Sequence, residues 1–365
     1  MATNITVWTT QTGGAFQDAA TTQRWLNVTR RNFVLYGLAQ NLPKISPLAG
    51  LLLKNSDTQP FQPDFIIQPV YGGLTGTDLT SAQPQWVDAT AGTVEIRDFK
   101  ADVMYAKYTP SILGNAIRFG MFEQAVMQSP LNIIDLLAIK ATEVFIQLLS
   151  VYANTILGTR GTDDKKFYGL LDLVDNGTAQ PTYAQIDRAT YPWWNSPIYD
   201  YSAIADANLP VYMNIKRVIS KYAKEHGHIY GMPHVAVTDF STFQKVLEGF
   251  INFERYIVGE VSNIAEERGY RIKGIDIDGI ALFPDPYLTT YTEGTNTYGR
   301  IFFLNLDHIR FTTANPFEFY MTDWNFELIN GRLSYVSAIL LAGQFWTDKP
   351  RAHFRIDRVP TLTVI

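Results

Sequence analysis

One stretch of the chain, residues 131–157, constrains the fold more than any other because it predicts a single long helix. Ser129 and Pro130 precede it, which suits a cap followed by a first-turn proline, and Gly158 closes it. At a rise of about 1.5 Å per residue, this helix is a rod of roughly 40 Å. Its polar side chains are too many for a membrane span: Asn132, Asp135, Lys140, Glu143, Gln147, Ser150 and Asn154.

Residues 60–108 predict a long two-stranded β excursion that precedes the helix. One strand is expected at 65–71 and another at 93–105, with a tip rich in Gly, Pro, Thr and Ser between them. An isolated hairpin is only marginally stable in water. We therefore expect this hairpin to rest either on its own domain or on a neighbouring molecule.

The remaining chain mixes helices and strands, so the fold class is α+β. Residues 1–21 are polar and predict an extended arm, and residues 22–41 predict a helix with apolar contacts from Trp25, Val28, Phe33, Leu35 and Leu38. The middle of the chain, residues 160–310, predicts two helices: one at 209–226 that ends at Gly227, and one at 242–253 that is capped by Asp239 or Ser241. It also predicts a buried strand at 234–238, a hairpin that turns at Asp278-Gly279, and a strand at 301–305.

The tail predicts a long β-hairpin. Residues 325–329 form one arm, Asn330-Gly331 the turn, and residues 333–341 the other arm. Asn-Gly between alternating apolar residues is the strongest short-range signal for such a turn.

Composition excludes several classes of function. Among 365 residues there is no cysteine, which excludes disulfides, thiolate metal sites and cysteine nucleophiles. Charged residues make up only 18%, which indicates that much of the surface does not face water. The net charge is -5 and no basic run is present, which argues against a sequence-specific DNA or RNA reader. A weakly acidic protein that merely encloses nucleic acid remains compatible with these values.

Searches for catalytic, cofactor and metal motifs yield no candidate residues. His226 and His228 form a close pair without a third ligand at metal-site spacing, so a helix end is the simpler interpretation. Asp276 and Asp278 resemble the opening of a calcium loop, but the remaining ligand positions are missing. No phosphate loop and no nucleophile elbow occurs in the sequence. We predict no catalytic residues, no cofactor and no metal.

Residues 167–197 combine a strand-like run, a turn, a polar link and two adjacent tryptophans held between prolines. Large amphipathic rings in a rigid loop are typical of contact surfaces. The alternative is that both tryptophans are packed inside the chain's own core. The segment contains the pattern that we call the assembly motif: Gly169, Asp175, Gly177, Asp187, Arg188, Thr190, Pro192, Trp193 and Trp194.

The assembly motif, placed just after the long helix, resembles a pattern in the major capsid proteins of tailed bacteriophages with the Hong Kong 97-like fold. The order of the expected elements resembles that family over most of the chain. The resemblance implies an N-terminal arm at 1–55, an E-loop at 56–110 and a P-domain with the spine helix at 111–160. It further implies an α/β A-domain at 161–310 and a P-domain β-hairpin with the C-terminal return at 311–365.

The resemblance implies a function as well as a fold. The expected protein is a shell subunit that self-assembles into hexamers and pentamers of an icosahedral or prolate head enclosing double-stranded DNA. Its implied location is the virion, after assembly in the host cytoplasm, with portal and scaffolding proteins and an added cementing protein as partners. No long charged scaffolding segment precedes the arm, so scaffolding is expected as a separate protein or not at all. An encapsulin-type compartment shell and, in a different class, a hydrolytic enzyme are the alternatives.

A covalently locked shell is not expected. Some members of that family form an isopeptide bond from an E-loop lysine, but here no lysine lies between Lys54 and Lys100. Boiling assembled material in detergent should therefore give a single band at the 41.2 kDa of one chain. A ladder of multimers that survives boiling would contradict this prediction.

Overall fold

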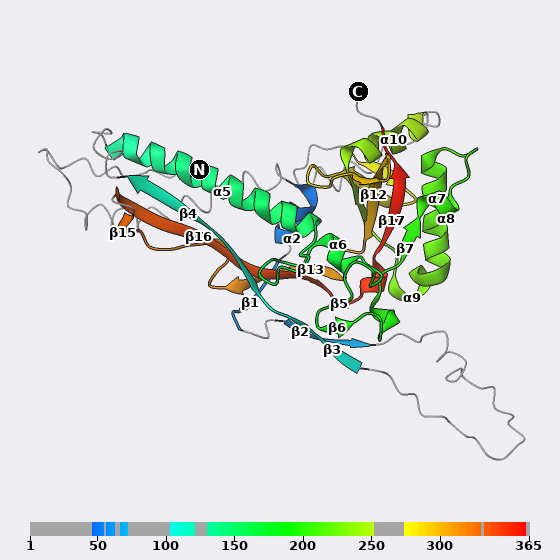
Figure 1. Cartoon of the computed structure of the whole chain (residues 1–365), viewed down its shortest axis with the longest axis horizontal. Coiled ribbons are helices and arrows are strands. Elements are labelled where there is room, and N and C mark those ends of the chain that lie inside the picture. Colours follow the sequence, from blue (N-terminus) through cyan, green and yellow to red (C-terminus); the bar gives the residue numbers. More distant parts are fainter. Residues whose placement is uncertain are drawn as a thin grey trace, which may run out of the picture.

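The computed structural model of the chain describes residues 46–54, 56–62, 66–71, 103–120, 130–251, 274–329 and 332–362. The predicted arm at 1–21, the predicted helix at 22–41 and the tip of the hairpin lie outside the described residues. The molecule is elongated, with one long helix over long strands at one end and a second sheet with its helices at the other (Figure 1).

The long helix predicted at 131–157 is confirmed as α5 (Pro130–Leu157). It lies along two long strands, β4 (Ser111–Gly120) and β16 (Arg332–Thr347), which pair in antiparallel register (Figure 1). No helix in the described part of the chain combines the length and hydropathy needed to cross a membrane.

A six-stranded sheet is built around β16. The tail hairpin is confirmed as β15 against β16, paired from Asn325↔Val336 to Ile329↔Arg332. The other strands of this sheet are β1 (Asp57–Pro60), β13 (Ile309–Asn315), β14 (Tyr320–Met321), β15 (Asn325–Ile329) and β4. Rings from α5 pack on this sheet: Phe145 lies 5.3 Å from Phe319, and Tyr152 lies 5.0 Å from Phe311 between ring centroids.

A seven-stranded sheet forms the other end of the molecule. Its strands are β7 (Ile198–Asp200), β17 (Phe354–Pro360), β12 (Asn296–Leu304), β8 (Val235–Thr238), β10 (Ile280–Pro284), β9 (Ile275–Ile277) and β11 (Tyr291–Glu293). The predicted strands at 234–238 and 301–305 and the Asp278-Gly279 hairpin are confirmed. Successive side chains of β8 alternate between two cores: Val235 and Val237 join the core under α5, and Ala236 joins the core under the other helices.

Helices cover the outer face of that sheet: α7 (Tyr201–Ile204), α8 (Val211–Tyr222), α9 (His228–Tyr230) and α10 (Phe240–Ile251). Asp239 is confirmed as the cap of α10, since its carboxylate accepts the Thr242 N–H at 2.9 Å. The predicted stop at Gly227 is wrong. The chain continues through a π-helical turn, η2 (Ala223–Gly227), into α9. The helical run ends at Gly231, whose positive φ of 86° is typical of a helix C-terminus.

The predicted β excursion is confirmed at its base as β2 (Ile66–Tyr71) paired with β3 (Val103–Tyr108) in antiparallel register. One face of this hairpin is buried through Ile66, Val70 and Ala106. The opposite face exposes Ile67 by 48% and Tyr105 by 59%. The hairpin therefore presents to solvent an outer face with two exposed apolar side chains, on which Lys107 lies opposite Ile67.

Two strands pair with a sheet made mostly of residues from another of the expected parts of the chain. β1 falls in the predicted E-loop range, yet it pairs in parallel with β13 in the six-stranded sheet. β17 falls in the range 311–365, expected as the P-domain β-hairpin and C-terminal return, and it pairs with β12 and β7 in the seven-stranded sheet. The short turn η3 (Pro350–Ala352) lets this crossing occur, because it carries the chain from the end of β16 into the second sheet.

The fold contains a buried hydroxyl that costs stability. Tyr152 is 1% exposed, and its hydroxyl has no hydrogen-bond partner among the described residues. Tyr152→Phe is expected to raise the free energy of unfolding by about 1 kcal/mol, because it removes an unpaired polar atom and keeps the ring. Chemical unfolding monitored by tryptophan fluorescence measures this change.

Tyr108→Phe is the matched control, because the buried Tyr108 hydroxyl donates to the Thr347 carbonyl at 2.7 Å. That variant should lose about 1 kcal/mol. Equal destabilisation by both variants would show that the Tyr152 hydroxyl has a partner.

Candidate functional site

Residues 167–197 lie where α5 ends and the two sheets meet (Figure 1). The short strand-like run expected at the start of this segment is wrong, because residues 170–173 form a short helix. The segment contains α6 (Leu170–Leu173), β5 (Thr182–Tyr183), β6 (Ile186–Asp187) and η1 (Pro192–Trp194). We call the whole segment the junction.

The start of the junction is fastened to the end of α5. Gly169 approaches Gly158 so closely that a Cβ atom at position 169 would lie 2.3 Å from the Gly158 carbonyl oxygen. The buried carboxylate of Asp172 accepts the N–H of Gly169 at 2.9 Å and that of Arg160 at 2.6 Å, and it also accepts the Thr159 hydroxyl. Burial raises the pKa of Asp172, and these hydrogen bonds oppose the shift.

Arg188 fills the centre of the junction. Its side chain is fully buried, and its guanidinium donates to the carbonyl oxygens of Asp172 at 2.9 Å, Leu173 at 3.0 Å and Gln180 at 3.3 Å. Burial lowers the pKa of Arg188 from its usual value. A planar guanidinium can serve several carbonyls at once, which a lysine cannot.

Asp175 is the buried counter-charge. One carboxylate oxygen accepts the backbone N–H groups of Gly177 at 2.9 Å, Gln180 at 3.0 Å and Ala179 at 3.2 Å. Guanidinium nitrogens of Arg188 and Arg355 each lie 3.7 Å from a carboxylate oxygen, which is ion-pair distance rather than hydrogen-bond distance. The carboxylate thus closes the 175–180 turn and faces two cations.

Two further contacts connect this cluster to the sheets. Arg355, on β17, donates to the Val174 carbonyl at 2.8 Å. Gly177 has a φ of 89°, and a Cβ atom there would lie 3.0 Å from the Cβ of Arg188. Glycine therefore suits position 177 both for its backbone conformation and for the space beside Arg188.

Both tryptophans of the assembly motif lie in the chain's own core. Trp193 is 8% exposed and Trp194 is 1% exposed, and their ring centroids lie 5.7 Å apart in an edge-to-face arrangement. The indole N–H of Trp194 donates to the Tyr183 carbonyl at 3.1 Å. Internal packing is therefore the correct interpretation of these two rings, rather than an exposed contact surface.

Three residues of the assembly motif lie on the surface instead. Pro192 is exposed at the start of η1, and its carbonyl accepts from Arg351 at 3.0 Å. Asp187 and Thr190 are exposed and form a local turn, in which the Asp187 carboxylate accepts the Thr190 hydroxyl. That hydrogen bond lowers the pKa of Asp187. The motif therefore divides into a buried cluster and a separate surface turn.

Sequence reasoning missed Gln344, which links three parts of the fold. Its side-chain amide is fully buried on β16; the carbonyl accepts the Tyr168 N–H at 2.8 Å and the NH₂ group donates to the Thr109 carbonyl at 2.7 Å. The β2–β3 hairpin is also fastened by the Lys107 N–H, which donates to the Ala184 carbonyl at 3.0 Å. An amide inside a long apolar strand was the available signal for Gln344.

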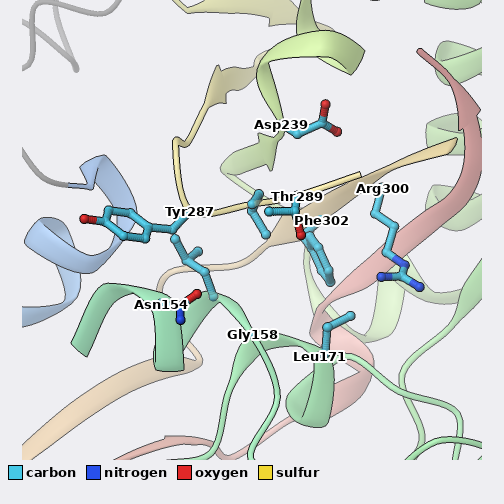
Figure 2. Close-up of a pocket in the computed structure, with 10 residues that line it drawn as sticks. Asn154, Gly158, Leu171, Asp239, Tyr287, Thr289, Arg300 and Phe302 are labelled. Carbon is cyan, nitrogen blue, oxygen red and sulfur yellow. The ribbon is translucent and has the colours of Figure 1, made fainter. Parts of the chain in front are cut away.

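A small cavity of about 90 Å³ lies beside the junction, between the end of α5 and β12 (Figure 2). Asn154, Leu171, Asp239 and Arg300 contribute to its lining. The Asp239 carboxylate bonds to Thr242, and the Arg300 guanidinium stacks 3.8 Å over the Tyr291 ring and pairs with Asp357. The two charged groups do not converge, and pockets for small ligands are typically about 300 Å³ or larger. This cavity therefore does not have the form of an active site.

The candidate metal residues have structural roles in the described part of the chain. His226 lies between the rings of Tyr222 and Tyr230, at centroid distances of 5.8 and 6.4 Å. Asp276 caps the β9–β10 turn at the Gly279 N–H, and Asp278 pairs with Lys216 at 2.7 Å. Among the described residues, no group of three or more acidic or histidine side chains is placed to hold a metal ion.

The chain has the Hong Kong 97-like fold of tailed-phage major capsid proteins. It is similar to a chain of the cyanophage A-1(L) capsid asymmetric unit, with a TM-score of 0.58 and 15% sequence identity, over 87% of this chain and 93% of that chain. Sequence comparison alone gives no match to a protein-family model or to a curated protein.

Two other solved structures are less similar. A chain of the Ralstonia phage GP4 capsid has a TM-score of 0.48 and 12% identity, over 85% of this chain and 87% of that chain. A chain of the holo-SrpI encapsulin complex from Synechococcus elongatus has a TM-score of 0.45 and 12% identity, over 86% of this chain and 90% of that chain.

The buried charges predict a sharp loss of stability when Arg188 is removed. Arg188→Met removes the guanidinium donor from the carbonyl oxygens of Asp172, Leu173 and Gln180, of which the Leu173 carbonyl keeps the Ser196 hydroxyl as a donor. It also leaves Arg355 as the one cation that faces the Asp175 carboxylate among the described residues. We expect a loss of about 3–5 kcal/mol in the free energy of unfolding, the usual cost of breaking a buried pair. Chemical denaturation of the purified protein measures it.

Arg217→Met is the matched control, because Arg217 is half exposed and pairs with Asp206 at 3.6 Å. Surface pairs contribute about 1 kcal/mol or less. Similar losses in both variants would mean that the Arg188 cluster does not hold the junction together.

Proposed function

We propose that this chain is the major capsid protein of a tailed phage. Copies would assemble into hexamers and pentamers of an icosahedral or prolate head that encloses double-stranded DNA. The observation that carries the proposal is the shared fold with the cyanophage A-1(L) capsid chain over 87% of this chain. The role of the chain is then structural, and its chemistry is the burial of surface between copies.

The β2–β3 hairpin supports this proposal in physical terms. Its two strands pair with each other and with no other described strand. Its outer face exposes Ile67 and Tyr105, and Tyr residues are enriched in the centres of protein interfaces. A two-stranded ribbon with one apolar face in water gains stability when a second chain covers that face.

The junction supports assembly indirectly in this proposal. Arg188, Trp193 and Trp194 are buried within one chain, so they would act by fixing the angles between α5, the hairpin and the seven-stranded sheet. Of the assembly motif, only Asp187, Thr190 and Pro192 are exposed for direct contact with another copy. The divisions proposed for the chain remain an arm, an E-loop, a P-domain in two pieces and an A-domain.

The proposal extends to partners and location. Portal and scaffolding proteins would meet the shell during assembly in the host cytoplasm, and a cementing protein would stabilise it afterwards. The mature location would be the virion. The chain's net charge of -5 fits non-specific enclosure of DNA better than tight binding to it.

Electron microscopy of the purified chain tests the proposal. Closed shells tens of nanometres across are expected, and small oligomers only would overturn it in favour of the enzyme alternative. The contents of native particles separate the two kinds of shell. Nuclease-protected double-stranded DNA supports a virion, and an enclosed protein cargo would point to an encapsulin-type compartment.

A substitution on the outer face of the hairpin makes the test specific. Tyr105→Asp places a charge on a half-exposed apolar face, so it should abolish shells while the unfolding midpoint of the free chain stays unchanged. Tyr105→Phe keeps the ring and should assemble normally. Normal shells from Tyr105→Asp would exclude this face from the contacts between copies.

A further inference from the structure

Two short segments carry the chain from one sheet to the other, and they are bonded to each other. The first, residues 305–308, leads from the end of β12 into β13. The second, residues 348–353, leads from the end of β16 through η3 into β17. Nδ1 of His308, in the first segment, lies 3.0 Å from a carboxylate oxygen of Asp348, in the second. We call these segments the two crossings.

A buried histidine links the crossings from inside. His353, at the end of the second crossing, is fully buried. Its Nδ1 accepts the backbone N–H of Asn305, in the first crossing, at 3.1 Å. Its Nε2 lies 3.0 Å from the hydroxyl oxygen of Thr347, the last residue of β16. One ring is therefore bonded beside the end of β12 and at the end of β16, which are strands of different sheets.

The partners of the ring fix the position of its hydrogen. A backbone N–H can only donate, so Nδ1 of His353 must offer a lone pair to Asn305. The Thr347 hydroxyl donates its own hydrogen to the His308 carbonyl at 2.6 Å, so toward Nε2 it acts as the acceptor. The ring is therefore neutral, with its hydrogen on Nε2.

A second proton does not fit this arrangement. It would bind Nδ1 of His353 and turn that atom into a donor that faces the N–H of Asn305. Burial lowers the pKa of His353 to about 3, the nearby His308 lowers it further, and Asp348 opposes the shift. The neutral form of the ring is thus favoured by both its hydrogen bonds and its burial.

The other charged side chains of the crossings are directed to other partners or to solvent. Asp307 lies 4.0 Å from the half-exposed ring of His234. Lys349 is exposed, and Arg351 donates to a carbonyl oxygen of η1 at 3.0 Å. Arg355, just after the crossing, donates to a carbonyl of the junction. The pH response of the ring is therefore set mainly by its burial rather than by these charges.

We propose that His353 is an acid-sensitive fastener, which holds the two crossings, and with them the two sheets, together only while its ring is neutral. Protonation places donor against donor at Asn305, so that hydrogen bond opens first and the end of β12 is released from the second crossing. The inference does not rest on the proposed function, because it concerns contacts inside one folded chain.

The direction of the pH dependence follows from the two states of the chain. In the unfolded chain His353 binds a proton near its ordinary pKa of 6.5, and in the folded chain it does so only near pH 3. The contribution of the neutral ring is fully present above about pH 6.5 and is lost progressively as the pH falls toward 3. Uptake of one proton on unfolding raises the unfolding equilibrium constant about tenfold per pH unit in this range.

His353→Asn tests the fastener, because the asparagine side-chain oxygen can accept the Asn305 N–H but does not titrate. Chemical denaturation between pH 7 and about pH 4.5 gives the unfolding equilibrium constants of the unaltered chain and of the variant. The ratio of the variant's constant to that of the unaltered chain should fall about tenfold for each pH unit below 6.5. A ratio that stays constant over this range would overturn the proposal.

His228→Asn is the matched control, because it makes the same chemical change at an exposed ring on α9. The ratio for this variant should stay the same at every pH, since the ring at position 228 is in water in both states. A tenfold change per pH unit in this variant as well would overturn the assignment of the pH dependence to His353.

Hydrogen exchange in the unaltered chain tests the same contact if His353→Asn does not fold. The protection factor of the Asn305 amide, corrected for the intrinsic pH dependence of exchange, should fall about tenfold per pH unit below 6.5. Amides in the middle of β16 should keep their protection to lower pH. An Asn305 amide whose protection does not change between pH 6 and about pH 4.5 would contradict the proposal.

Discussion

The buried guanidinium of Arg188 is the interaction on which the rest of the structure depends. It serves carbonyl oxygens from both α6 and the 175–180 turn, so one side chain sets the shape of a loop that would otherwise be irregular. Removing such a cation from water is expensive, and the cost is offset only because several acceptors and Asp175 surround it. A segment held in this way behaves as a rigid block although it contains little regular structure.

That rigid block decides how the elongated molecule is arranged. The end of α5, the base of the β2–β3 hairpin and the seven-stranded sheet all contact it. The two apolar cores lie on opposite faces of the seven-stranded sheet, because successive side chains of β8 and β12 point alternately into one core and the other. Long elements can therefore project in different directions from one fixed centre (Figure 1).

The sequence predicted the regular elements well and the junction poorly, for a physical reason. The 131–157 helix and the Asn330-Gly331 hairpin carry local signals, namely helical periodicity and turn chemistry, that survive in any tertiary context. The strand-like run within residues 167–177 is instead the short helix α6, because Asp172 accepts the N–H of its N-cap residue Gly169. The same carboxylate accepts the N–H of Arg160, a contact between parts of the chain that sequence alone does not reveal. The tryptophans were open to two interpretations, because burial depends on what surrounds them rather than on their neighbours in sequence. The fold class came from element order, which a low overall identity does not erase.

Gln344 gives the molecule a mechanical property. Its single amide is bonded at once to Thr109 at the root of the hairpin and to Tyr168 at the start of the junction. A planar amide cannot rotate toward one partner without losing the other. A force applied to the base of the hairpin would therefore reach the junction through this side chain as well as through the Lys107–Ala184 backbone hydrogen bond.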